Sequence, residues 1–228
     1  MQKTTQVTKD IYYVGVNDRV KVLFENLWPL PQGVSYNAYI VEDEKTVLVD
    51  TVDACYVNEL SRRVQSLLGD KPIDYLVVNH MEPDHSGAIE WLVTRYPNIQ
   101  IVGNKRTIEM LNGFYGIEDN VLMVEDLGEI SIGKNRLKFF LTPMVHWPET
   151  MMTYVPEKKV LFTGDAFGTF KTLDGGIFDD ELDIDRYEDE MLRYFSNIVG
   201  KYSPMVQKAM AKLKDLEVSI IATTHGPV

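Results

Sequence analysis

Apolar residues recur along the chain with two different spacings, which together predict a mixed α/β protein. Short apolar runs bounded by turn residues predict strands at 11–16, 36–41, 46–50, 73–78, 99–102, 137–141, 160–162 and 218–222. Helical spacing predicts helices over 56–68, 89–96, 105–114 and 186–199, and another from Ser203 onward. No internal repeat, low-complexity segment or change of composition divides the chain, so we expect one domain over residues 1–228.

Candidate cap residues mark the starts of two of these helices. Ser203 followed by Pro204 is typical of a helix start, with the serine as N-cap and the proline as first helical residue. Asp84 or Ser86 is a candidate N-cap for the helix predicted over 89–96. Such side chains accept hydrogen bonds from the free N–H groups of the first turn.

The composition describes an ordinary folded domain with an acidic surface. The chain has 228 residues, of which 45% are hydrophobic and 25% charged, so it can bury a sizeable core. Its net charge of −11 argues against a nucleic-acid partner or an anionic membrane, because both need an excess of Lys and Arg. A bound polyvalent cation would offset part of this charge.

Cysteine usage and hydropathy indicate a cytoplasmic protein. A single cysteine, Cys55, excludes an intramolecular disulfide framework and a thiolate-rich zinc or iron–sulfur site. The first five residues lack the apolar core of a secretory signal, and no apolar run approaches the length of a membrane span.

Four side chains that bind metals lie within six residues, shortly after the strand predicted at 73–78. They are His80, Glu82, Asp84 and His85. A loop between a strand and a helix is a common place for a rigid scaffold to carry chemistry. The acidic residues are also compatible with a helix N-terminus, and the two interpretations do not exclude each other.

The same arrangement recurs later in the chain. His146, Asp165 and His225 each follow one of the later predicted strands, and all four histidines of the protein fall at such strand ends. If these four strands lie side by side, their carboxyl ends meet at one edge. We therefore predict one shared metal site.

The motifs around these residues resemble the metallo-β-lactamase fold, and within it the diiron module of the flavodiiron proteins, which are oxygen and nitric oxide reductases. The resemblance covers nearly the whole chain and rests on the segments 15–18, 35–39, 80–87, 146–149, 164–168, 193–194 and 225–227. It implies a single-domain αββα sandwich that holds two iron ions.

The resemblance also implies a role for each candidate residue. One iron would be bound by His80, Glu82 and His146, and the other by Asp84 and His225, with Asp165 and an oxo or hydroxo group as bridges. His85 would either bind the second iron or leave that position to solvent. Tyr194 would supply a hydrogen bond or a proton to bound oxygen, and a purely packing role for this tyrosine is equally open.

Glu82 favours iron over zinc within this fold. Hydrolases of the fold generally carry histidine at that position, and a histidine-rich pocket suits zinc as a Lewis acid. Imidazoles mixed with carboxylates suit iron, whose oxidised state is favoured by negative charge. A dizinc hydrolase, in which metal-bound hydroxide attacks an ester or amide, is therefore a third-ranked alternative.

One departure from the family shapes the functional hypothesis. Flavodiiron proteins normally continue into a flavodoxin domain that binds FMN, whereas this chain ends three residues after His225, so we expect no FMN in it. Two ferrous ions supply two of the four electrons that reduce oxygen to water. The leading hypothesis is an oxygen-binding diiron protein that acts as a sensor with a signalling partner, or as a scavenger with an external electron donor.

The second hypothesis is an oxygen or nitric oxide reductase that receives electrons from a separate flavoprotein or rubredoxin. The ligands serve both hypotheses equally. A homodimer is also left open, because family dimers bring the flavin of one subunit to the irons of the other, and the pairing surface can persist without the flavin.

Overall fold

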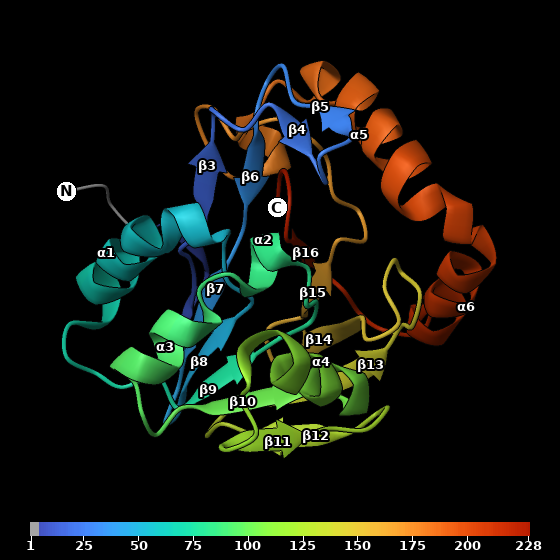
Figure 1. Ribbon diagram of the computed structural model, residues 1–228. Helices are drawn as coiled ribbons and strands as arrows, with labels where there is room; N and C mark the ends of the chain where they lie inside the picture. The colour runs from blue at the N-terminus through green and yellow to red at the C-terminus, as the bar shows by residue number, and fades with distance from the viewer. Residues whose placement is uncertain (1–4) are drawn as a thin grey trace.

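Two β-sheets lie face to face in the computed structural model, which describes residues 5–228 (Figure 1). The larger sheet has the order β1-β2-β7-β8-β9-β10-β11, with strands Thr5–Thr8, Ile11–Tyr13, Tyr39–Glu42, Thr46–Val49, Tyr75–Val77, Gln100–Gly103 and Val121–Met123. The smaller has the order β12-β13-β14-β15-β16, with strands Glu129–Ser131, Arg136–Leu141, Met151–Val155, Val160–Gly164 and Ile220–Thr223. Two short ladders complete the strands, β3 (Val16–Asp18) with β6 (Val34–Tyr36) and β4 (Leu23–Phe24) with β5 (Trp28–Pro29). Residues 1–4 lie outside the described residues. They belong to the first five residues, in which the sequence indicated no secretory signal.

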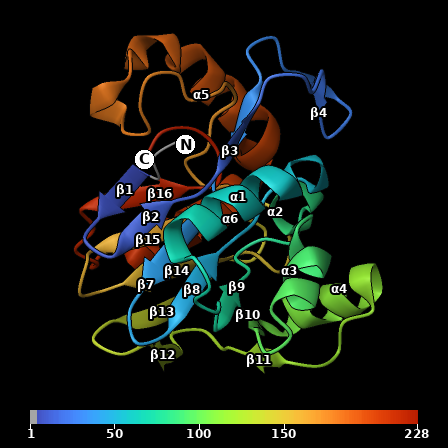
Figure 2. The same cartoon turned by 90° about the vertical axis from the view of Figure 1, so that its left-hand side faces the viewer.

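Helices lie on both sides of the sandwich (Figure 1), and Figure 2 looks onto the side that carries α1. Against the larger sheet lie α1 (Val57–Leu68), α3 (Ile89–Arg95) and α4 (Lys105–Tyr115). A helical arm lies on the other side. It consists of α5 (Glu188–Tyr194), a π-helical turn at Phe195–Val199, a 3₁₀ turn at Gly200–Tyr202 and α6 (Ser203–Leu213). Of these elements, α6 packs on the smaller sheet. The predicted α/β sandwich is therefore confirmed.

The core has an inner and an outer part because the central strands are buried on both faces. Val47, Val49 and Val77 pack with Phe139 and Phe162 of the opposite sheet. The residues between them along each strand point outward to the helices instead, as Leu48 and Leu76 do. Two-sided burial explains why the runs that predicted these strands are apolar throughout rather than alternating.

Two predicted strands are each interrupted in the structure. The run at 11–16 divides into β2 and β3, which belong to different ladders, and the run at 36–41 divides into β6 and β7. A Cβ on Gly15 would lie 2.5 Å from the carbonyl oxygen of Tyr36, so only glycine allows the chain to cross here. Asn37 leaves the ladder because its N–H donates to Thr224.

The predicted helix caps are wrong. Ser203 is the first residue of α6 rather than its N-cap, since a 3₁₀ turn precedes it directly and its hydroxyl donates to the carbonyl of Gly200. Asp84 and Ser86 lie inside a separate single turn, α2 (Pro83–Ser86), and cap no helix. The helix predicted over 186–199 begins later as α5 and changes to π geometry after Tyr194. Within residues 5–228, no helix combines the length and apolar character needed to cross a bilayer.

Candidate metal centre

All the predicted ligands meet at one edge of the sandwich, between the two sheets. The loop after β9 belongs to the larger sheet and carries His80, Glu82, Asp84 and His85, whereas the remaining three ligands follow β13, β15 and β16 of the smaller sheet. The four strands therefore do not lie side by side in one sheet, as the sequence suggested. Because β13, β15 and β16 run in the same direction, their carboxyl ends still lie together and face the end of β9.

The first group of ligands consists of His80, Glu82, His146 and Asp165, all buried. Glu82 Oε2 lies 3.2 Å from His80 Nε2 and 3.3 Å from His146 Nε2. Asp165 Oδ2 lies 3.6 Å from His80 Nε2 and 2.9 Å from His146 Nε2. Two imidazole nitrogens and two carboxylate oxygens thus converge on one point.

The second group consists of Asp84, His85 and His225. Asp84 Oδ2 lies 3.4 Å from the Nε2 atoms of both histidines, and these two nitrogens are 2.9 Å apart. Asp165 Oδ1 lies 3.1 Å from His85 Nε2 and 3.7 Å from His225 Nε2. The structure thus places His85, whose role the sequence left open, among the groups that could hold a metal ion.

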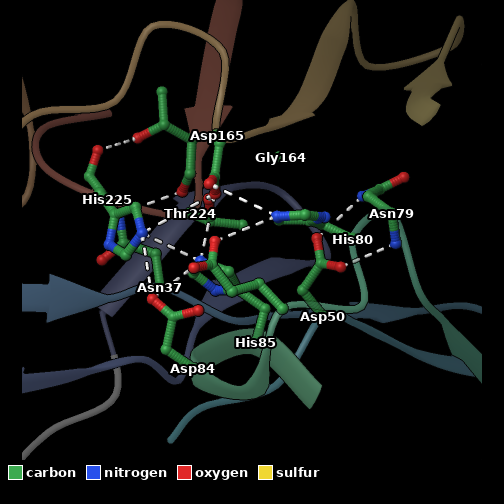
Figure 3. A network of polar contacts seen from close by, with 12 residues as sticks. Asn37, Asp50, Asn79, His80, Asp84, His85, Gly164, Asp165, Thr224 and His225 are labelled. Atoms are coloured by element: carbon green, nitrogen blue, oxygen red, sulfur yellow. Dashed lines mark hydrogen bonds and ion pairs between the residues drawn. The ribbon is translucent and has the colours of Figure 1, made fainter. Parts of the chain in front are cut away.

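Asp165 lies between the two groups and gives one oxygen to each (Figure 3). It follows Gly164, whose φ of +58° turns the chain sharply at the end of β15. The hydroxyl of Thr224, next to the ligand His225, donates to Asp165 Oδ1 at 2.6 Å. The aspartate is thus oriented to bridge two cations.

The donor set fits bound cations. Both carboxylate oxygens of Asp84 are buried and have no hydrogen-bond partner among residues 5–228. The facing Nε2 atoms of His85 and His225 leave room for one hydrogen between them at most, and a cation would satisfy both lone pairs. Burying a carboxylate that has neither a hydrogen-bond donor nor a cation beside it costs free energy. This arrangement is therefore expected where a metal ion binds.

The outer nitrogens of the histidines have different partners. His80 Nδ1 lies 2.7 Å from Glu149 Oε1, and His225 Nδ1 lies 2.7 Å from the carbonyl oxygen of Ser35. His85 Nδ1 has no partner in the described part of the chain. Such contacts orient metal-binding imidazoles so that Nε2 faces the metal. Glu149 was not among the candidate residues predicted from the sequence, although its position three residues after a predicted ligand was the available signal.

A buried network supports the loop that carries four of the ligands. Asp50 accepts hydrogen bonds from the backbone and side-chain nitrogens of Asn79, at 2.8 and 2.9 Å. Burial raises the pKa of Asp50. The hydrogen bonds from Asn79 act in the opposite direction, because they favour the ionised form, but the effect of burial is larger. Asn79 Oδ1 in turn accepts from Thr153 of the opposite sheet, so the network joins both sheets beside His80.

Carboxylates control the protonation of the metal-free centre. Burial alone would lower the pKa values of His85 and His146, but the neighbouring carboxylates, above all Asp84 for His85 and Asp165 for His146, raise both to about 9. The pKa of Asp165 is well below its usual value, because the surrounding histidines outweigh the effect of burial. In the metal-free protein, His85 and His146 therefore keep their protons at neutral pH.

Aromatic side chains pack against one histidine of each ligand group. The ring of Trp147 lies edge-on to His80 with centroids 5.2 Å apart. Tyr194 packs on His225 with centroids 5.5 Å apart, and its buried hydroxyl has no hydrogen-bond partner within residues 5–228. Burial and the charge of Asp165 raise the pKa of Tyr194 well above its usual value, so its hydroxyl keeps its proton.

Glu25 is a further acidic residue at this end of the molecule. It lies in the tight turn between β4 and β5, with a φ of +49°. Burial and the nearby carboxylate of Glu82 raise its pKa. Glu25 was not among the candidate residues predicted from the sequence.

The sandwich fold, with its two groups of candidate metal ligands, defines a metallo-β-lactamase-like domain. Residues 34–226 match the family described as "ODP family beta lactamase", and the chain belongs to this family. Its relatives are flavodiiron proteins. The nitric oxide reductase of Moorella thermoacetica is 34% identical over 230 residues, which cover 99% of this chain and 57% of that protein. This chain spans about half the length of the curated relatives it matches.

Solved structures show the same fold. The rubredoxin:oxygen oxidoreductase of Desulfovibrio gigas is 33% identical, with a TM-score of 0.94 over 99% of this chain and 57% of that one. The flavodiiron protein of Giardia intestinalis is 31% identical, with a TM-score of 0.94 over 100% of this chain and 55% of that one. The similarity thus covers the diiron core of these proteins.

Proposed function

We propose that this chain is a non-haem diiron protein that binds dioxygen and reduces it in part, as an oxygen sensor or scavenger acting with a separate partner protein in the cytoplasm. The observation that carries the proposal is Asp165, whose two oxygens face two groups of mixed imidazole and carboxylate ligands. Such mixed donor sets suit iron, and a shared carboxylate suits two ions held side by side.

Each residue has a proposed part in this site. His80, Glu82 and His146 would hold one ion, and Asp84 and His225 would hold the other, with His85 in the second group. When bound, two ferrous ions would supply two electrons for the partial reduction of oxygen. Tyr194 keeps its hydroxyl proton in the pocket and offers a hydrogen bond there, while the ring of Trp147 limits the access of water.

A first experiment tests the metal and the oxygen chemistry together. Protein produced with both iron and zinc available is analysed for metal, reduced without oxygen, and exposed once to oxygen while its visible absorption is followed by stopped flow. Two iron ions per chain and a spectral change that persists long after mixing support oxygen binding. Two zinc ions and no iron would instead support the hydrolase.

The second candidate function is an oxygen or nitric oxide reductase that depends on a separate flavoprotein or rubredoxin. The names of the relatives favour it, since they include a nitric oxide reductase and a rubredoxin:oxygen oxidoreductase. Steady consumption of either gas after addition of a reduced rubredoxin or flavodoxin supports this function. Fast multiple turnover would rule out the sensor role.

A further inference from the structure

We propose that Glu149 is a positioning residue that makes the two metal positions unequal, so that the His80 group binds its metal more tightly than the His85 group. This inference rests on the proposed function only in assuming that the centre holds two metal ions. It concerns a carboxylate outside both ligand groups.

The carboxylate of Glu149 is held firmly against the first group. The side chain is fully buried, and its Oε1 accepts hydrogen bonds from His80 Nδ1 at 2.7 Å and from the backbone N–H of Met81 at 2.9 Å. The carbonyl of the same residue accepts from the side chain of Asn104 at 2.5 Å. The other carboxylate oxygen, Oε2, has no hydrogen-bond partner in residues 5–228. The hydrogen bonds therefore direct the charge of Glu149 toward His80.

The two ligand groups are otherwise alike. Each has two imidazoles, one carboxylate of its own and one oxygen of Asp165. In the second group, however, His225 donates to a neutral carbonyl and the outer nitrogen of His85 has no partner in the described chain. Only the first group therefore has a histidine backed by an anion.

An anionic partner changes how an imidazole binds a metal. A carboxylate that accepts from Nδ1 fixes the tautomer, orients the ring and makes Nε2 a stronger donor. Charge-assisted hydrogen bonds are also shorter and stronger than neutral ones. Removing such a partner typically lowers metal affinity by about 10–100-fold. His80 should hence bind a cation more strongly than His85 or His225.

The test measures Co(II) affinity separately at each position, by competition with a chelator. The substitution Asp84→Asn removes a ligand of the second group only, and His146→Gln removes one of the first group only. Glu149→Gln is then added to each background. It removes the charge, while its amide oxygen still accepts hydrogen bonds. Glu157→Gln, at an exposed ion pair with Arg136, is the matched control.

We expect Glu149→Gln to weaken Co(II) binding by about 10–100-fold in the Asp84→Asn background and to change it little in the His146→Gln background. Equal weakening in both, or none in either, would overturn the inference. Thermal melting of the metal-free variants reports whether they fold.

A second comparison avoids any change at Glu149. With Glu149 intact, the Asp84→Asn variant should bind Co(II) more tightly than the His146→Gln variant. If the two affinities are equal, the inference is wrong although the metal centre stands. If the native chain binds no metal at all, the proposed function itself fails.

Discussion

Each histidine of the centre uses one ring nitrogen toward the metal position, and the other nitrogen determines how firmly the ring is held. Glu149 and the Ser35 carbonyl occupy that second position for His80 and His225, whereas His85 has no such contact within residues 5–228. The orientation of His85 therefore depends more on the cation itself and on Asp84 and Asp165.

The carboxylate of Asp84 is the only one that the second group does not share with the first. We expect Asp84→Asn to reduce metal content from two ions per chain to one, because an amide cannot replace the charge of a carboxylate ligand. Metal analysis after dialysis against a weak chelator measures this. Asp183→Asn, which removes an exposed partner of Arg186, should keep both ions. Retention of two ions by Asp84→Asn would exclude its role as a ligand.

The histidine pKa values predict how the stability of the metal-free protein depends on pH. His85 and His146 have folded-state pKa values of about 9, above the ordinary 6.5. The folded state therefore binds more protons than the unfolded state between these values, so the free energy of unfolding should fall as pH rises from 6.5 to 9. Urea titrations across this range measure the trend. A free energy that rises there would contradict the assigned pKa values.

The same protons compete with the metal. Metal binding displaces them, so affinity should increase over the same pH range in which the metal-free fold loses stability. Calorimetry in buffers of different ionisation enthalpy measures the number of protons released.

At the scale of elements, the centre depends on short connections that hold the strand ends at fixed positions. The turn α2 lies so close to the segment before α1 that a Cβ on Gly87 would lie 2.7 Å from the carbonyl oxygen of Pro83 and 3.0 Å from that of Val52. These contacts are with backbone atoms, which cannot move aside as a flexible side chain can. Gly87 is therefore required by the packing of the loop that carries the first ligands.

Gly87→Ala should lower the free energy of unfolding by about 1–3 kcal/mol, the usual effect of overpacking. The matched control is Gly113→Ala in α4, where an added Cβ meets nothing within 4 Å. There alanine should stabilise the protein by up to about 1 kcal/mol, because glycine is a poor helix former. Urea denaturation of the metal-free variants compares the two. Equal effects would mean that the loop can shift to accept a side chain.

The sequence predicted the elements and the candidate ligands better than the connections. His146, Asp165 and His225 were found because each follows an apolar run, and that signal is local. Which sheet a run joins is not local, since the apolar runs of β9 and β15 look alike although the strands belong to different sheets. The contact between Glu149 and His80 joins residues 69 positions apart, so it depends on how the sheets pack.

Asn37 illustrates the same limit. Its side-chain amide donates to the carbonyls of Thr223 and Gly226, which surround the last ligand, and it accepts from the hydroxyl of Tyr13. In the sequence it belongs to an apolar run and was assigned to the interior of a strand. The hydrogen bonds that remove it from the ladder come from the opposite sheet, and no local pattern indicates them.

At the scale of the whole molecule, the centre joins the two sheets at one edge of the sandwich. The loop after β9 contributes ligands from the larger sheet, and the strand ends of β13, β15 and β16 contribute them from the smaller one. The inner core holds the same sheets together mainly by apolar contacts, and a few hydrogen bonds, such as the one from Thr153 to Asn79, join them beside the centre. A cation bound by ligands from both sheets would therefore act as a further cross-link between them.

Metal binding should stabilise the whole fold and protect both sheets against opening at that edge. A free metal concentration 1,000 times the dissociation constant adds about 4 kcal/mol to the free energy of unfolding for each site. Amide hydrogen exchange with and without the metal should then show slower exchange in residues 79–87 of one sheet and 223–226 of the other. The hairpin that joins β7 and β8 lies outside the centre. Its amide exchange should slow only as far as the overall free energy of unfolding increases. Protection in only one of the two ligand segments would mean that the ion is bound by one sheet alone, and the cross-link would have to be abandoned.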